Sequence, residues 1–221
     1  MADSEIAPLV EAVLRQKTAE DLWALMLCED PVYGKIPEEL RGEAVLRAAQ
    51  FGRQASEGVA ARFGAMDPIA IVRALEVRLT WSDEAHLFGK IVRTSTYAHR
   101  TRTITIYTSS VEEMNRALAA PDLASVLEVR DVGPVYIAHE LFHHLEEESL
   151  GRAANLFRIT TLKLGPFALR SGIGQLSEIA ADAFAQRLLG LRDVPRLLDY
   201  VTVWIHNPEA GRRRLGSLAN A

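Results

Sequence analysis

The stretch His139-Glu140-Leu141-Phe142-His143 is the most informative segment for predicting the fold of this chain, because it has the pattern HExxH. Its two histidines are four positions apart, which places them on one face of an α-helix, one turn from each other. Both imidazoles can then bind a single metal ion, with Glu140 beside a water that the metal activates. The alternative is a surface helix with two half-buried histidines, so the surrounding sequence must discriminate between these interpretations.

The residues around this segment have the pattern of a helix with one apolar face. Pro134 suits the first turn of a helix, and four apolar side chains share the face that we expect to be buried: Val135, Ala138, Phe142 and Leu145. His139 and His143 fall at the edge of that face, half-buried. His144 and the run 146–148, which is Glu-Glu-Glu, are expected to be solvated.

Composition limits the class of protein. The chain has 221 residues, with 48% hydrophobic and 24% charged residues, which is ordinary for a globular domain. A net charge of −4 gives no reason to expect a nucleic-acid partner. Cys28 is the single cysteine, so any metal must be held by histidines and carboxylates. The acidic first residues do not resemble a signal peptide, and no segment predicts a membrane span, so we expect a cytoplasmic protein.

The order of elements predicts an α+β fold that is mostly helical. Helical spacing runs from residue 6 to about 63, and Asp67-Pro68 suits the start of a short helix. Segments 77–81, 90–97 and 102–107 have the β-branched or alternating pattern of strands, which predicts a small three-stranded antiparallel sheet. From about residue 111 the chain is expected to be helical nearly to its end, with breaks at prolines and glycines. We expect two regions, an N-terminal helical region 1–65 and a second domain 66–221.

A third metal ligand is expected downstream, in Glu178-Ile179-Ala180-Ala181-Asp182. Glu178 and Asp182 share one helix face, and small residues beside them allow close approach to another helix. Glu178 could then bind the metal, while Asp182 accepts the outer N–H of a ligand histidine. The alternative is an alanine-rich core helix with two incidental acids.

The two segments 138–143 and 178–185 resemble the gluzincin class of zinc metallopeptidases, and more narrowly the bacterial ImmA/IrrE-type family. In that family HExxH is followed by a helix of pattern E-x-x-A-(N/D)-x-F-A. The resemblance spans roughly residues 65–190 and implies a zincin-like fold. It implies Zn²⁺ held by His139, His143 and Glu178, with Glu140 as catalytic base and Asp182 orienting a histidine. Phe142 departs from the family, which often has a small residue there.

The leading hypothesis is therefore a zinc-dependent endopeptidase that acts on a peptide or protein substrate, for example one in a regulatory pathway. An oxyanion donor is expected, and the sequence does not rank the candidates Tyr97, His99 and His206. The resemblance also implies that the strand near 103–107 is a sheet edge that pairs with an extended peptide. One alternative is a zinc-binding sensor or interaction protein of zincin fold without turnover. Another is a helical binding protein without metal.

Overall fold

Helices make up most of the chain in the computed structural model, which describes residues 6–64, 67–84, 87–88, 91–165 and 167–220. The α-helices are α1 (Ile6–Gln16), α2 (Ala19–Cys28), α3 (Glu38–Phe63), α4 (Pro68–Ala74), α5 (Thr108–Leu118), α6 (Pro121–Val126), α7 (Gly133–Leu145), α8 (Gln175–Leu189), α9 (Pro195–His206) and α10 (Pro208–Asn220). The strands are β1 (Arg78–Ser82), β2 (Leu87–Phe88), β3 (Ile91–Val92), β4 (Ser95–Ala98), β5 (Thr103–Tyr107), β6 (Arg158–Leu164) and β7 (Phe167–Gly172). Short turns η2 (Tyr33–Lys35), η3 (His99–Thr101), η4 (Glu146–Leu150) and η5 (Ala153–Asn155) complete the described elements. The fold is therefore α+β and mostly helical, as predicted.

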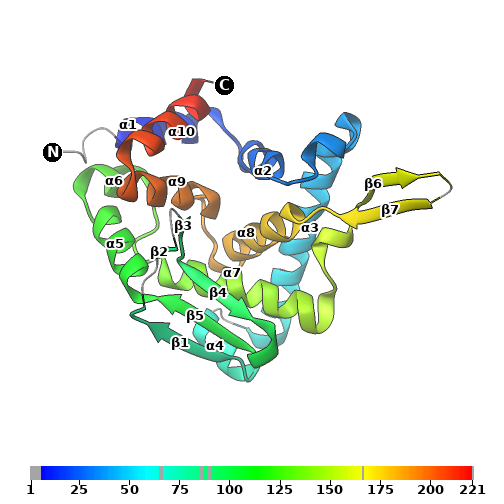
Figure 1. Ribbon diagram of the computed structural model, residues 1–221. Coiled ribbons are helices and arrows are strands. Elements are labelled where there is room, and N and C mark those ends of the chain that lie inside the picture. Colours follow the sequence, from blue (N-terminus) through cyan, green and yellow to red (C-terminus); the bar gives the residue numbers. More distant parts are fainter. Residues whose placement is uncertain (1–5, 65–66, 85–86, 89–90, 166, 221) are drawn as a thin grey trace.

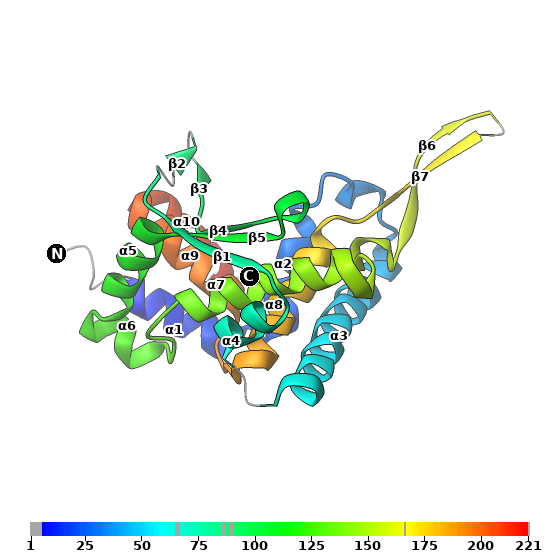
Figure 2. The same ribbon diagram turned by 90° about the horizontal axis from the view of Figure 1, so that it is seen from below.

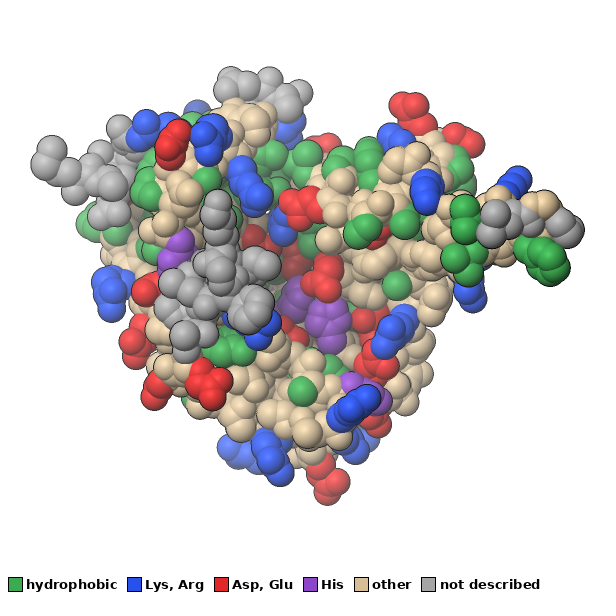
Figure 3. Space-filling model, viewed as in Figure 1, with side chains coloured by type: hydrophobic (Ala, Val, Ile, Leu, Met, Phe, Trp, Pro, Cys, Tyr) green, Lys and Arg blue, Asp and Glu red, His purple; other side chains and the backbone are tan. Residues whose placement is uncertain are grey.

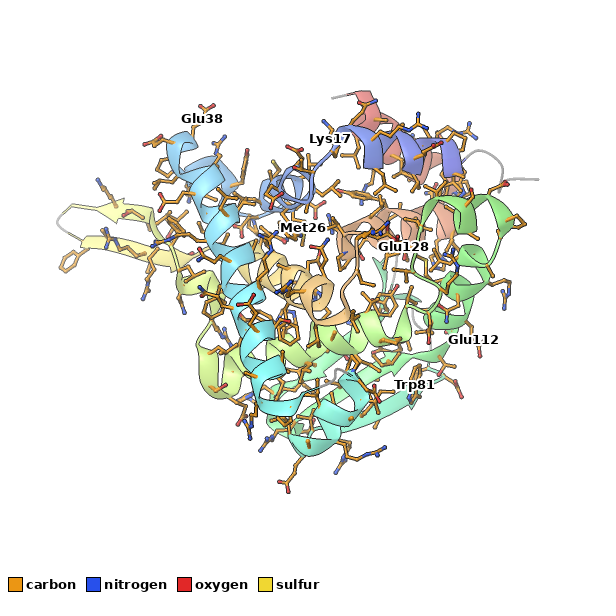
Figure 4. All side chains as sticks on the ribbon, turned by 180° about the vertical axis from the view of Figure 1, so that it is seen from behind. Lys17, Met26, Glu38, Trp81, Glu112 and Glu128 are labelled. Carbon is orange, nitrogen blue, oxygen red and sulfur yellow. The ribbon has the colours of Figure 1, made fainter. Side chains whose placement is uncertain are left out.

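The N-terminal helices share one hydrophobic core with the rest of the chain. The predicted helices are present, and the Asp67 side chain caps α4 by accepting from the Ile69 N–H. α3 packs along α8, and α1 packs against α10 and α9 (Figures 1 and 4). The buried cluster runs from Ile6 to Ala219. The expected division at residue 65 therefore does not divide the core.

The prediction of an antiparallel sheet is wrong, because the sheet is mixed. In the described part of the chain three strands lie in the order β1-β5-β4. β5 is parallel to β1 and antiparallel to β4. After β1 the chain forms the small β2–β3 pair and reaches the far edge as β4, and β5 then returns into the gap between them. The expected strand 90–97 is accordingly divided into β3 and β4, with Lys90 outside the described residues.

The position of β5 also corrects the expectation about a peptide-binding edge. Residues 103–107 form the central strand, with a partner on each side, so they have no free edge. β4 is one of the two terminal strands of this sheet, and it lies next to α7 (Figures 1 and 2). Strand alternation directs Ser95 and Tyr97 to the same face, where both contact α7 through Glu140 and His144. The edge available beside α7 is therefore β4.

A β-hairpin replaces part of the helical stretch that we expected after residue 111. β6 and β7 pair antiparallel and project from the body of the molecule (Figures 1 and 2). The β-branched residues Ile159, Thr160 and Thr161 favour strand over helix, and Gly165 has a φ of +59°, which suits a turn. The hairpin exposes Leu162, Phe167 and Leu169. Residues 158–164 therefore form a strand because of their local β propensity, although apolar and polar residues do not clearly alternate in this segment.

α8 is held in place by two parts of the N-terminal region. Gly52 of α3 packs so closely that an added Cβ would lie 2.0 Å from the Ala180 carbonyl oxygen. The buried Asp30 accepts a 2.9 Å hydrogen bond from the Gln175 N–H, at the first turn of α8. This bond satisfies one of the amide groups that a helix start leaves without an internal partner. Residues before position 65 therefore position the helix that carries Glu178.

No helix in the described ranges is both long enough and apolar enough to cross a membrane.

Candidate metal centre

α7 carries the HExxH segment through the centre of the molecule, and most of its faces are buried. Phe142 is fully buried between two other helices, with its ring 6.2 Å from that of Phe51 on α3 and 5.5 Å from that of Phe184 on α8. The aromatic contact joins both sequence motifs, since Phe184 belongs to the second one. Phe142 is thus a packing residue that fixes the distance between α7 and α8.

His139, His143 and Glu178 converge from α7 and α8. The two Nε2 atoms lie 3.2 Å apart. Glu178 Oε2 is 3.3 Å from His139 Nε2, and Oε1 is 3.6 Å from His143 Nε2. The histidine side chains are about one-fifth exposed and that of Glu178 is 45% exposed. The described residues therefore bring together two imidazoles and one carboxylate that could hold a metal ion.

Each histidine uses its other nitrogen to bind a buried carboxylate. His139 Nδ1 lies 3.3 Å from Asp182 Oδ1, and His143 Nδ1 lies 3.2 Å from Glu146 Oε2. Glu146 also accepts hydrogen bonds from the Ala153 N–H at 2.7 Å and from Ser177 Oγ at 2.9 Å. Partners of this kind fix the ring orientation and leave Nε2 directed toward the metal position.

The charges around the two imidazoles favour positive charge at this point. Burial lowers the pKa of His139, but hydrogen bonds with Asp182 and Glu178 outweigh it and hold that pKa well above its usual value. Burial also opposes protonation of His143, yet Glu146 and Glu178 raise its pKa to about 9. Burial raises the pKa of Glu178, but the two histidines lower it below its usual range. The site is therefore built for a cation between its nitrogens and the Glu178 carboxylate.

Glu140 is buried and lines the same cavity as His139 and Glu178. Its Oε1 accepts a 2.7 Å hydrogen bond from Ser95 Oγ, so β4 holds this carboxylate in place. The cavity has a volume of about 240 Å³. Figure 3, which has the viewing direction of Figure 1, shows histidine side chains next to acidic ones in a hollow near the middle of the visible face of the molecule. A carboxylate that could accept a proton thus lies within the space that a substrate would occupy.

Two residues that we expected to be solvated are buried. His144 is 2% exposed, and its Nδ1 lies 2.8 Å from the Tyr97 hydroxyl. Glu146 is 5% exposed and binds His143. The expectation failed for Glu146 because η4 continues the helix beyond α7, and side chains three positions apart on a helix are neighbours. That i, i+3 spacing was a signal in the sequence that could have revealed Glu146 as the partner of His143.

The candidate oxyanion donors do not line the cavity beside the three ligand candidates. Tyr97 bonds to His144. The His99 ring is exposed and lies 3.9 Å from Glu148, while His206 lies 3.3 Å from Glu113 of α5. Tyr136, which was not among the expected oxyanion donors, does line the cavity.

Comparison of the chain with protein-family models, with curated proteins and with solved structures gives no match. The resemblance to ImmA/IrrE-type peptidases therefore rests on the two sequence motifs alone.

Proposed function

We propose that this protein is a zinc-dependent endopeptidase that hydrolyses peptide bonds with a metal-activated water. The observation that carries the proposal is the convergence of His139, His143 and Glu178, together with the buried Glu140 that lines one cavity with His139 and Glu178. Two histidines and one glutamate, with a separate glutamate as base, are the residues that zinc peptidases of the HExxH type require.

The geometry of the three donors fits zinc. Ligand atoms 2.0–2.2 Å from a tetrahedral ion are roughly 3.3–3.6 Å apart. The two Nε2 atoms are 3.2 Å apart here, and Glu178 lies 3.3 Å from His139 Nε2 through Oε2 and 3.6 Å from His143 Nε2 through Oε1. Three protein ligands leave one position for water or substrate, as in catalytic rather than structural sites. The buried carboxylates of Asp182 and Glu146 complete the surroundings that metal-binding histidines usually have.

In this proposal Glu140 transfers the proton and Ser95 positions Glu140. When bound, zinc acts as a Lewis acid that polarises a carbonyl and makes water acidic enough to ionise near neutral pH. Glu140 takes the proton from the attacking water and passes it to the leaving amine. Ser95 holds Glu140 in position through the 2.7 Å hydrogen bond to Oε1, which leaves Oε2 for this proton transfer.

β4 provides a place for the substrate backbone. It is a terminal strand of the sheet, and Ser95 at its start donates a hydrogen bond to Glu140. An extended peptide that adds to this edge forms backbone hydrogen bonds and brings one of its peptide groups next to the cavity. The same edge would suit proteins of varied sequence, since backbone pairing does not depend on side chains.

Zinc content and zinc-dependent turnover test the proposal. We expect the purified protein to bind about one equivalent of Zn²⁺ because it has one complete set of donors in its described residues. A chelator should abolish cleavage of a panel of unfolded proteins, and added zinc should restore it. Mass spectrometry of the products and elemental analysis provide the measurements. Failure to bind zinc after reconstitution, or cleavage that resists chelation, would contradict the proposal.

Replacement of Glu146 by Gln should weaken zinc binding by roughly 10- to 100-fold. The amide oxygen of Gln can still accept from the Ala153 N–H and Ser177 Oγ, but its NH₂ group cannot accept from His143. Competition against a coloured chelator measures the affinity. Glu147→Gln removes a neighbouring carboxylate that pairs with Arg152 instead, and it should leave the affinity unchanged. Equal affinities of Glu146→Gln and wild type would argue against the role of Glu146.

A further inference from the structure

The cavity beside the candidate zinc ligands is strongly acidic. Among the described residues, its walls include four carboxylates, Glu140, Glu178, Asp182 and Asp199, and no lysine or arginine. The proposed function assigns a role to the first three. It does not use Asp199, which α9 places on the cavity wall together with Pro195.

Asp199 is held at one oxygen and accessible from the cavity. Its Oδ2 accepts from Nη1 of Arg196 at 3.1 Å. Arg196 is shared with Glu29, whose Oε1 lies 2.5 Å from Nη2. The Arg196 side chain is 13% exposed and that of Asp199 is 49% exposed. The ion pair therefore holds a carboxylate on the cavity wall, and about half of the Asp199 side chain remains exposed.

A buried polar atom of another residue on the same walls has no hydrogen-bond partner among the described residues. It is Oδ2 of Asp182, which is 4% exposed and whose Oδ1 pairs with His139. A buried polar atom without a partner costs free energy, which a ligand that donates hydrogen bonds would recover. A carboxylate oxygen accepts and does not donate, so it points to a ligand rich in donors.

We propose that this cavity is a substrate subsite for a basic side chain, arginine or lysine, next to the peptide bond that is cleaved, with Asp199 as the residue that selects it. A guanidinium or ammonium group donates hydrogen bonds only, which matches the acceptors on the cavity walls. Charge-assisted hydrogen bonds of this kind are about twice as strong as neutral ones. This inference rests on the proposed peptidase function and gives its substrate class.

The electrostatics around Asp199 favour a positive group in the cavity. Enclosure raises the pKa of Asp199, Arg196 opposes this change, and the carboxylate of Asp182 raises the pKa further, to about 6. Two carboxylates that face one cavity repel each other unless a positive group enters between them. A basic side chain supplies that group.

Binding of two matched zinc-directed ligands tests this subsite without relying on turnover. We would measure, by calorimetry on the zinc-loaded protein, peptide hydroxamates that carry either arginine or its neutral analogue citrulline on either side of the hydroxamate. In one of the two positions the arginine ligand should bind at least tenfold more tightly. Asp199→Asn should remove this preference. Glu29→Gln takes away the other partner of Arg196 outside the cavity and should preserve it.

The outcomes separate this inference from the peptidase proposal. Equal binding of arginine and citrulline ligands to the wild type in both positions, or a preference that survives in Asp199→Asn, would overturn the subsite. Cleavage of peptides without preference for a basic residue would overturn it too while leaving the peptidase function intact. A clear arginine preference in a protein that cleaves no peptide would support the subsite and refute the peptidase.

Discussion

Glu140→Gln should abolish most peptide hydrolysis while leaving zinc binding unchanged. Glutamine has nearly the same shape, and its side-chain oxygen can still accept from Ser95 Oγ, so the local structure is retained. It cannot accept a proton at neutral pH, and loss of a general base costs roughly 10²- to 10⁴-fold in rate. Glu140 is not among the three donors of the candidate metal site, so the zinc content should stay at that of the wild type.

Product analysis by mass spectrometry and elemental analysis of the same samples measure both effects. Glu147→Gln serves as the matched control, since it makes the same chemical change on the turn that follows α7. It should retain both zinc and activity. Equal rates for wild type and Glu140→Gln would favour the alternative of a zinc-binding sensor or interaction protein without turnover.

The site was more predictable from the sequence than the sheet, for physical reasons. The histidine spacing in 139–143 and the acidic pair Glu178 and Asp182 are local patterns on helices, where the period of 3.6 residues determines which side chains share a face. Their meeting required only that two helices pack together, and α7 and α8 do so. Strand order depends instead on contacts between segments far apart in the chain, which local patterns do not encode. The mixed sheet and the central position of β5 therefore could not be derived.

The burial of Glu146 beyond the end of α7 also differs from the prediction. The run of three glutamates at 146–148 predicts a solvated face. Glu146 is buried nonetheless because His143, Ser177 and the Ala153 N–H supply its hydrogen bonds. A charged residue enters a core only where its partners are already present. His143 is three positions away on the same helix, but Ser177 and the Ala153 N–H come from α8 and η5, which the sequence around residue 146 does not reveal.

The geometry of the site thus depends on a residue far from it. Glu178 is carried by α8, and α8 is positioned by its close contact with α3. At Gly52 an added Cβ would lie 2.0 Å from the Ala180 carbonyl oxygen and 3.0 Å from the Phe184 backbone nitrogen. These atoms are backbone, so they cannot move aside without shifting α8. Ala180 itself lies half a turn from Glu178 on the same helix.

Gly52→Ala should therefore destabilise the protein by about 3 kcal/mol, the upper part of the range for added methyl groups in a packed interior. In an unstrained helix the same substitution stabilises by roughly 0.5–1 kcal/mol, so the effect has the opposite sign to helix propensity. The displacement of α8 should also weaken zinc binding, because Glu178 moves relative to the two histidines. Urea unfolding measures the first effect and chelator competition the second.

Gly58→Ala provides the control on the same helix. An added Cβ at Gly58 meets nothing within 4 Å, so this variant should be more stable than the wild type by about 0.5–1 kcal/mol, with unchanged zinc affinity. The contrast isolates the contact with α8, since both variants change glycine to alanine within α3. If Gly52→Ala and Gly58→Ala stabilise the protein alike, the close packing of α3 against α8 is not what holds Glu178 at the metal site.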